Sequence, residues 1–367
     1  MGNYDNPFEF DFDSYIQEIE PSKQEKGRNW ATAIGLQKVD GLSPSKYLYE
    51  TAKRNIEGDI SLEEAKEIID SYYESKEIRT SDDENSEEAD KVSARIAQIL
   101  SEKAFSFNPN QLLSIHEKLF KGVFKSVKAG EFRTYNITKK EWALDGDTVF
   151  YTNADLIQET LKYDFENEKN FDYSTLSMEQ TVKHITRFVA NIWQIHPFGE
   201  GNTRSTAVFT IMYLCSLGFE VNNEPFEKHS WYFRNALVRA NYTNVKKSIY
   251  MNNIFLEKFF ENLLLGKNNE LKNRYTHIRY TENIEKTSVE NNKTFGTKEK
   301  TSVQIMDLMK KNPNITLQQV ANQLELSKRA VEMQVKKLRE QGKVNRIGAT
   351  KNGSWEVRGQ SYGNEEI

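Results

Sequence analysis

The chain has 367 residues, with 50 Lys and Arg against 54 Asp and Glu, and this length suits two or three domains. Its single cysteine, Cys215, excludes an internal disulfide and a cysteine-based zinc site. The most apolar stretch, residues 207–219, is shorter than the roughly 20 residues of a membrane span, and the acidic N-terminus lacks the basic start of a signal peptide. We therefore expect a folded cytoplasmic protein with no membrane partner.

Charge is distributed unevenly along the chain. Residues 298–358 contain thirteen Lys and Arg against six Asp and Glu, a net charge of +7, so the remainder carries −11. The polar segment 267–298 is predicted to be a helical tail followed by a linker. We therefore predict an N-terminal helical region over 1–90, a central domain over 91–266 and a basic C-terminal domain over 299–358.

Helical patterns dominate the first 266 residues. Ser43-Pro44 is typical of a helix start and Gly58 of a helix end, which predicts a helix between them. A second helix starts at Ser61, which forms a capping-box pattern with Glu64. Apolar periodicity predicts further helices over 88–103, 109–120, 155–166, 177–195, 202–217 and 226–260.

Strand patterns are scarce. Two short runs of strand-forming residues, 135–138 and 148–151, flank Asp145-Gly146, a dipeptide typical of hairpin turns. The sequence therefore predicts a mainly α fold with one β-hairpin in the central domain.

A polar loop, residues 196–204, lies between two apolar helices. Pro197 ends the incoming helix, and Gly199 and Gly201 permit positive φ angles and the close approach of a ligand. The loop leads into a helix N-terminus, where unpaired N–H groups and the helix dipole favour an anion, and Arg204 adds a positive charge. These features predict a phosphate site.

Two residues of this loop could carry chemistry. Glu200 offers a hard oxygen ligand of the kind that binds Mg²⁺ together with substrate phosphates. His196, with an ordinary pKa near neutrality, is suited to take a proton from an attacking hydroxyl. By contrast, His116 lies on an apolar helix and is predicted to support the core or the site without reacting.

The loop sequence His-Pro-Phe-Gly-Glu-Gly-Asn-Thr-Arg resembles the signature of the Fic family, His-Pro-Phe-x-(Asp/Glu)-Gly-Asn-x-Arg, at all seven specified positions. The resemblance extends over about residues 93–265, including the runs 115–120 and 129–133. It implies a Fic-type helical catalytic core over 91–266, with the predicted hairpin as its flap.

The resemblance implies transfer of AMP from Mg-ATP to a Ser, Thr or Tyr hydroxyl of a protein target or of the chain itself. In this scheme His196 is the base, Glu200 holds Mg²⁺, and Phe198 anchors the loop. The implied nucleotide-binding residues are Phe198, Gly199, Glu200, Gly201, Asn202, Thr203 and Arg204. The flap would bind the target segment as an added strand through Ile137, Thr138, Val149 and Phe150.

Two positions depart from the family pattern. Thr203 stands where the family often has Gly, and Ala207 stands where it has a second Arg that grips the γ-phosphate and pairs with an inhibitory glutamate. The binding mode of the γ-phosphate therefore stays open, with Arg234 and Arg239 as candidate substitutes.

An inhibitory element is also implied by the resemblance. Residues 53–58 are similar to the family's (Ser/Thr)-x-x-x-Glu-(Gly/Asn) motif, although Lys53 replaces Ser or Thr. This similarity implies that the helix predicted over 43–58 is inhibitory and that Glu57 is its inhibitory residue.

The basic C-terminal region shows three helical patterns, 302–311, 316–324 and 327–341, followed by a ribbon over 343–357. This order resembles a winged helix-turn-helix, whose third helix would read DNA. The predicted DNA contacts are Ser327, Lys328, Arg329, Lys336 and Lys351. Such domains also dock proteins or dimerise, so DNA and a homodimer partner are both open.

Three functions follow from the sequence. The leading one is a protein adenylyltransferase with intramolecular inhibition. The second is Fic-type transfer of another phosphate-containing group, which the Ala207 departure keeps open. The third is a DNA-binding regulator whose core senses nucleotide and modifies mainly itself.

Overall fold

The computed structural model describes residues 21–75, 86–102, 104–221, 223–280, 305–306, 308–324, 328–340, 342–347 and 354–357. The chain divides into two compact units, residues 1–280 and 281–367, each with its own hydrophobic core. The boundary between the units falls inside the segment 267–298 that the sequence predicts as tail and linker.

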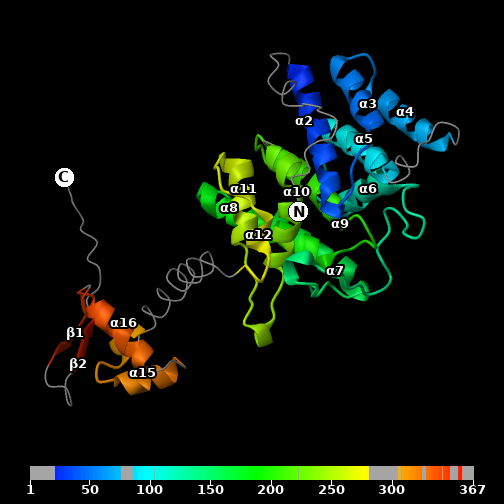
Figure 1. The fold of residues 1–367 in the computed structure, drawn as a ribbon. Helices are drawn as coiled ribbons and strands as arrows, with labels where there is room; N and C mark the ends of the chain where they lie inside the picture. The colour runs from blue at the N-terminus through cyan, green and yellow to red at the C-terminus, as the bar shows by residue number, and fades with distance from the viewer. Residues whose placement is uncertain are drawn as a thin grey trace, which may run out of the picture. The chain divides into compact units, whose positions relative to one another are not determined.

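The first unit consists of helices joined by loops (Figure 1). In order, its described helices are α2 (Pro21–Gly35), η1 (Leu36–Asp40), α3 (Lys46–Glu57), α4 (Leu62–Glu74), α5 (Glu87–Ser101), α6 (Pro109–Phe120), η3 (Trp142–Leu144), η4 (Ala154–Leu156), α7 (Ile157–Lys169), α8 (Met178–Ile195), α9 (Asn202–Ser216), α10 (Glu224–Ala240), η5 (Val245–Lys247), α11 (Ile254–Leu265) and α12 (Asn273–Thr276). No helix in the described parts of the chain is both long and apolar enough to cross a bilayer.

The start of α3 is set by a buried carboxylate. Ser45, and not Ser43, caps the helix, because its hydroxyl accepts the N–H of Leu48 at 3.2 Å. The Ser45 N–H and hydroxyl donate in turn to the Asp90 carboxylate at 2.9 and 2.5 Å, and Asp90 also accepts the Tyr73 hydroxyl at 2.7 Å. The predicted start at Ser43-Pro44 is therefore wrong by two residues, since a contact with α5 selects the cap.

Other helix ends follow the local sequence. Ser61 and Glu64 form the predicted capping box at the start of α4. Gly58 closes α3 with a φ of 91°, a conformation that favours glycine. These predictions are confirmed.

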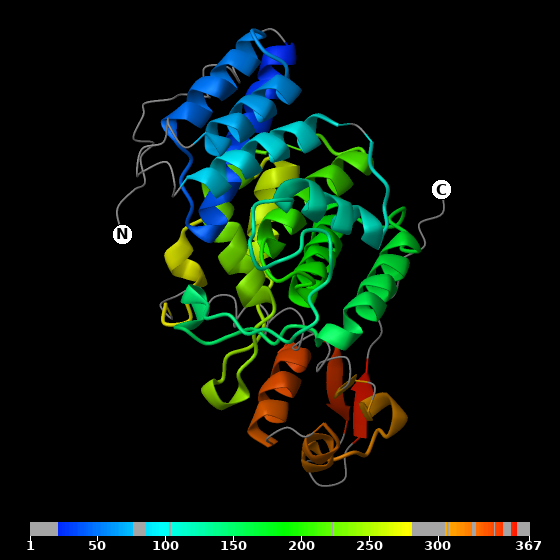
Figure 2. The ribbon, with the colours of Figure 1, turned by 90° about the vertical axis from the view of Figure 1, so that its right-hand side faces the viewer.

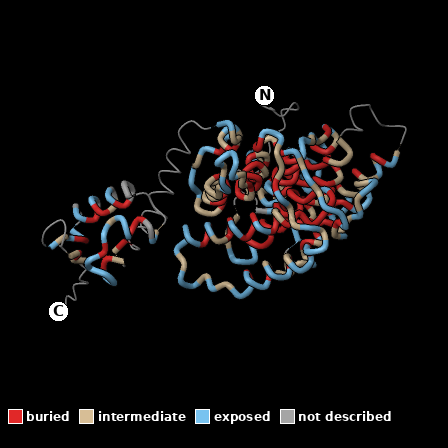
Figure 3. Tube along the Cα trace, turned by 90° about the horizontal axis from the view of Figure 1, so that it is seen from below, coloured by how far each residue is buried: buried red, intermediate tan, exposed pale blue. Residues whose placement is uncertain are grey.

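Helix α9 is enclosed by protein along most of its length. Every residue from Asn202 to Leu214 is buried, and the helix packs against α5, α6, α8 and η1. Figure 3 shows buried residues concentrated within the helices of the first unit. The polar first turn of α9 therefore lies inside protein, where an uncompensated charge would be costly.

Residues 134–151 form a turn-containing loop, which we call the flap loop. Asp145 and Gly146 turn the chain with φ angles of 58° and 84°, as predicted. Trp142–Leu144 form a short 3-10 helix, however, and among the described residues of this loop no β ladder is present. The Lys139 N–H donates to the Thr148 hydroxyl at 3.2 Å, where a ladder would use a carbonyl. The predicted β-hairpin is therefore wrong.

The helix predicted over 226–260 is two helices. Helix α10 ends at Ala240 and α11 starts at Ile254. The intervening loop carries an isolated β-bridge between Asn244 and Ile249. Asn241 Nδ2 donates to the Leu237 and Ala190 carbonyls at 3.0 Å, so a polar side chain binds the C-terminal end of α10.

The second unit is a small helix and ribbon domain. Its described elements are helical residues 305–306 and 308–311, α15 (Leu317–Gln323), α16 (Lys328–Glu340), β1 (Val344–Ile347) and β2 (Ser354–Val357). The strands pair antiparallel, with Arg346 opposite Trp355. The indole of Trp355 is buried and donates to the Ile315 carbonyl at 2.9 Å, which ties the ribbon to the turn before α15.

Candidate active site

The loop between α8 and α9 is held in one conformation by its own residues. His196 ends α8 in the left-handed region, with φ 51° and ψ 58°, which is uncommon for a residue with a side chain. Gly201 precedes α9 with φ 73°, and an added Cβ there would lie 2.4 Å from the Phe120 ring. Gly199 does not adopt a positive φ, contrary to prediction, but a Cβ there would lie 2.7 Å from the Tyr135 hydroxyl.

Asn202 and Phe198 close the loop. The Asn202 side chain accepts the Phe198 N–H at 2.9 Å and donates to the Phe198 carbonyl at 2.8 Å. Phe198 is fully buried, and its ring stacks on that of His116 at 3.7 Å between centroids. The Asn202 side chain thus stabilises the conformation of the loop. An anion at this site would bind to the backbone N–H groups at the start of α9.

His196 is poised as a neutral base. The residue is 2% exposed, and burial lowers its pKa well below the ordinary value, with the positive charge of Lys139 as the next cause. Its Nδ1 lies 3.2 Å from the Trp193 carbonyl, which can only accept, so Nδ1 carries the proton and Nε2 keeps its lone pair. The Tyr151 ring lies 4.1 Å from the imidazole and helps to fix it.

Arg133 connects this loop to the flap loop. Its guanidinium donates to the carbonyls of His196 at 2.8 Å, Tyr135 at 2.7 Å and Ile195 at 3.3 Å, and also to the Thr152 carbonyl. These bonds satisfy carbonyl groups at the end of α8 that have no helical partner. The sequence places Arg133 in the family-like run 129–133 but does not reveal this role.

Glu200 is accessible and has one cationic partner. Its side chain is 53% exposed, and its carboxylate pairs with Lys139 Nζ of the flap loop at 3.0 Å. Its main-chain carbonyl lies 3.1 Å from His116 Nε2, while His116 Nδ1 accepts the Gly130 N–H at 2.9 Å. His116 therefore fixes the backbone of Glu200, in agreement with the supporting position predicted for it.

A single accessible carboxylate next to a helix N-terminus fits the way Mg²⁺ binds together with substrate phosphates. Among the residues that the structure describes, no three or more His, Cys, Asp or Glu side chains are grouped to enclose a metal ion. Glu200 would therefore hold Mg²⁺ jointly with a phosphate ligand and not in a cage made of protein alone.

Arg204, by contrast, is already bound by protein groups. Its side chain is 2% exposed and pairs with Asp40 at 2.8 Å and with Glu88 at 2.5 Å. Its Nη1 donates to Gln37 Oε1 at 3.1 Å, and the guanidinium lies 4.8 Å from the Phe120 ring. The arginine predicted to grip phosphate is thus engaged by two carboxylates that the sequence did not single out.

Glu57 is not among the partners of Arg204. Its carboxylate lies 3.7 Å from Lys53 Nζ on the same helix. Helix α3 packs against α2 and α4, and in Figures 1 and 2 it lies with α4 at the outer end of the first unit. The structure therefore does not bring the predicted inhibitory residue to Arg204.

Thr203 and Ala207, the two departures from the family pattern, both lie inside the protein. Thr203 accepts the buried Trp193 indole N–H at 3.0 Å, a bond that Gly could not provide. Ala207 is fully buried. Of the two candidate substitute charges, Arg234 acts on the pKa of His196, whereas Arg239 donates to the Thr276 carbonyl at 3.0 Å.

Arg234 belongs to a network behind His196. It pairs with the buried Glu141 at 3.0 Å, and Glu141 also accepts the Tyr151 hydroxyl at 3.1 Å. Burial raises the pKa of Glu141, while the charges of Arg234 and Lys139 oppose this shift. The Tyr151 ring then contacts His196, so the network orders the wall of the site.

The residues predicted to dock a target differ in exposure. Phe150 is 80% exposed, whereas Val149 is 1% exposed and belongs to the core. Thr138 is exposed and Ile137 is half-buried. Of the four, Phe150 and Thr138 are thus the most accessible to another chain.

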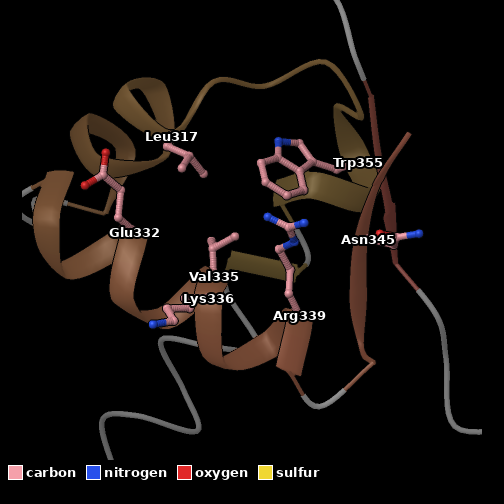
Figure 4. A pocket seen from close by; sticks show the side chains of 7 residues that line it. All are labelled: Leu317, Glu332, Val335, Lys336, Arg339, Asn345 and Trp355. Carbon is pink, nitrogen blue, oxygen red and sulfur yellow. The ribbon is translucent and has the colours of Figure 1, made fainter. Parts of the chain in front are cut away.

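In the second unit the structure describes only part of the predicted DNA surface. Lys336 is exposed on α16. Ser327 and Lys351 lie outside the described residues, as do the side chains of Lys328 and Arg329. A cavity of about 500 Å³ lies between α15, α16 and the ribbon, and Figure 4 shows the side chains that line it. Its lining residues are Leu317, Glu332, Val335, Lys336, Arg339, Asn345 and Trp355.

Comparisons with known proteins match a part of each unit to a family. Residues 106–214 match the Fic/DOC family, and residues 298–345 match a winged helix-turn-helix DNA-binding family. The chain therefore carries a Fic/DOC-family domain followed by a winged helix-turn-helix domain. No curated protein matches the chain.

Three solved structures resemble the chain at low identity. The N-terminal FIC domain of Bep8, a VirB-translocated effector from Bartonella sp. 1-1C, is 17% identical, with a TM-score of 0.39 over 57% of this chain and 91% of its own. BepC from Bartonella tribocorum, crystallised with AMPPNP, is 19% identical, with a TM-score of 0.35 over 46% and 80%. A Fic family protein from Desulfovibrio desulfuricans G20 is 10% identical, with a TM-score of 0.43 over 95% and 93%.

Proposed function

We propose that the first unit is a protein adenylyltransferase that moves AMP from Mg-ATP to a side-chain hydroxyl of a protein target or of the chain itself. The observation that carries this proposal is His196: a buried, neutral imidazole with its Nε2 lone pair available, on the loop that leads into the N-terminus of α9. A neutral base next to a helix start that can bind an anion suits attack by a hydroxyl on the phosphoanhydride of a nucleotide.

The proposed reaction uses these groups in order. The target hydroxyl loses its proton to Nε2 of His196 as its oxygen bonds to the α-phosphorus, and the bond from that phosphorus to the leaving oxygen breaks. Pyrophosphate leaves, and AMP stays on the hydroxyl oxygen. Bound Mg²⁺ at Glu200 would neutralise phosphate charge, while the N–H groups at the start of α9 orient the phosphates.

The test is to incubate the protein with ATP labelled separately at the α- and γ-phosphates and to weigh the modified product. Label from the α-position together with a mass gain equal to AMP supports the proposal. His196→Ala should abolish the labelling. Label from the γ-position would indicate transfer of a different phosphate-containing group, an alternative favoured by the buried Ala207.

We also propose that activity is restrained by Asp40 and Glu88. Both carboxylates form ion pairs with Arg204, so the guanidinium is not available to bind a phosphate group. In this proposal Asp40 and Glu88 have the inhibitory role that the sequence alone assigned to Glu57. Glu57 pairs with Lys53.

A second function, DNA binding by the second unit, is favoured by the match to a DNA-binding family and by the exposed Lys336 and Arg339 on α16. Binding to duplex DNA that weakens as salt rises would support it, because Lys and Arg release counterions from phosphates. Loss of nucleotide transfer in His196→Ala should leave this binding unchanged.

A further inference from the structure

Lys139 reaches the candidate active site from the flap loop. Its Nζ lies 3.0 Å from Glu200 Oε2, although the two residues are 61 positions apart in the sequence. The Lys139 N–H donates to the Thr148 hydroxyl, so the backbone at this position is fixed by the other arm of the flap loop. The side chain is 26% exposed, which places the ammonium at the mouth of the site and not deep within it.

The charge of Lys139 affects the pKa values of two buried groups, His196 and Glu141. It is the largest charge effect on the pKa of His196, ahead of those of Arg234 and Arg133. It also acts on the buried Glu141. An ammonium that influences the base and contacts Glu200 lies where the phosphates of a nucleotide would have to pass or bind.

Stability does not explain this contact. An ion pair in which the carboxylate is half exposed contributes little to stability, because solvent screens it and the two side chains lose freedom. Its neighbour Lys140 is the more exposed of the two, and no contact of its side chain is present among the described residues. The flap loop therefore directs one of two adjacent lysines into the site.

Arg204, the cation at the start of α9, offers no equivalent. Arg204 is buried and bound by Asp40 and Glu88, and Ala207 supplies no charge one turn later. A polyphosphate chain carries several negative charges, so it would compete with the single Glu200 carboxylate for the Lys139 ammonium.

We propose that Lys139 is a phosphate-binding residue of this site, paired with Glu200 when no nucleotide is bound and with the phosphate chain of a nucleoside triphosphate when it is. The inference deepens the proposed function and rests on the nucleotide site assumed there. Lys139 then contributes directly to nucleotide affinity, because a charge-assisted hydrogen bond to phosphate replaces one to carboxylate.

The test measures binding of ATP and of inorganic pyrophosphate to the full chain by calorimetry, in buffer containing a chelator so that no metal competes for either group. Lys139→Met should weaken binding of both probes by about tenfold or more, since a hydrogen bond to a charged group is lost. Lys139→Arg should retain most of the affinity. Lys140→Met is the matched control, with one charge removed from the same loop, and should bind as the unmodified protein does.

A second comparison separates the contact with phosphate from a general change of charge. Glu200→Gln frees Lys139 and should tighten metal-free binding of ATP. In the double variant Lys139→Met with Glu200→Gln this gain should disappear. If Glu200→Gln tightens binding equally with or without Lys139, repulsion between carboxylate and phosphate explains the gain, and the proposal is wrong.

The outcomes also distinguish this inference from the proposed function. If the unmodified protein transfers AMP but Lys139→Met binds both probes with unchanged affinity, the inference alone fails. If Lys139-dependent binding of pyrophosphate is present without any transfer of AMP, the inference holds and the proposed reaction fails. If neither probe binds to the unmodified protein in chelator, the inference is overturned, and the labelling experiment with Mg-ATP decides the proposed function separately.

Discussion

Replacing Asp40 by Asn and Glu88 by Gln should release Arg204 and tighten nucleotide binding. The two carboxylates lie 2.8 and 2.5 Å from the guanidinium, and both substitutions keep the size of the side chain while removing its charge. A hydrogen bond to a charged group contributes a net ~1.5–3 kcal/mol, which corresponds to a gain of about 10- to 150-fold in affinity if phosphate takes over the arginine.

The same change should lower stability in the absence of nucleotide. Arg204 is 2% exposed, and a buried charge that loses its partners is costly. The carboxylates are about one-third exposed, so water can compensate for part of this loss. Added ATP should therefore raise the melting temperature of the double variant more than that of the unmodified protein, because only the folded state binds it.

The assay combines ATP binding with α-label transfer, for each single variant and the double variant. Glu57→Gln is the control, since it makes the same Glu-to-Gln change as Glu88→Gln but at a carboxylate that does not contact Arg204. Unchanged affinity and transfer in a folded Asp40→Asn and Glu88→Gln protein would refute the reasoning. A gain seen only in Glu57→Gln would return the inhibitory role to the residue suggested by the sequence.

Three further predictions concern other parts of the chain. Tyr242→Phe should raise the pKa of Asp147 from about 2 toward its ordinary 3.8, because the hydrogen bond from the Tyr242 hydroxyl is the largest cause of the lowered pKa. In the unmodified protein, the stability that this carboxylate contributes is present above pH 3.8 and is lost as the pH falls toward 2. Carboxyl NMR titration measures this, and an unshifted Asp147 contradicts it. Glu168→Ala should lower the free energy of unfolding by about 1–3 kcal/mol, because the buried carboxylate accepts the Tyr213 hydroxyl at 2.5 Å and its removal leaves this buried donor without that acceptor. A loss below about 0.5 kcal/mol in urea unfolding would show that this hydrogen bond is not stabilising. Lys336→Ala should reduce the slope of log K for duplex DNA against log salt by about one, as for one lost phosphate contact, whereas Lys310→Ala, outside α16, should leave the slope unchanged.

Helix ends that depend on neighbouring residues could be predicted from the sequence. The capping box of Ser61 and Glu64 and the cap of α8 by Ser177 involve groups three residues apart, so the pattern itself contains the interaction. The start of α3 could not be predicted this way, because Asp90 is 45 residues from the Ser45 that it selects.

The flap loop shows a different limit. Its turn at Asp145 and Gly146 can be predicted from the sequence, because this dipeptide adopts positive φ angles locally. Whether the flanking runs form a ladder depends on what else their backbone and side chains can bind. Next to the turn, the Glu141 N–H donates to the Asp147 carbonyl, a main-chain bond between the arms. Further along, Arg133 donates to the Tyr135 and Thr152 carbonyls. The Thr148 hydroxyl accepts the Lys139 N–H, so side chains take the place of further ladder bonds.

The sequence by itself determined which residues form the candidate site, because His196, Glu200 and the start of α9 lie within nine contiguous residues and so must be close in space. Only the tertiary structure decided which charges meet that loop. Asp40 and Glu88 reach Arg204 from helices 164 and 116 positions away, and Lys139 reaches Glu200 from the flap loop. Electrostatic pairing depends on distance in space, and positions in a chain do not give that distance until the helices have packed.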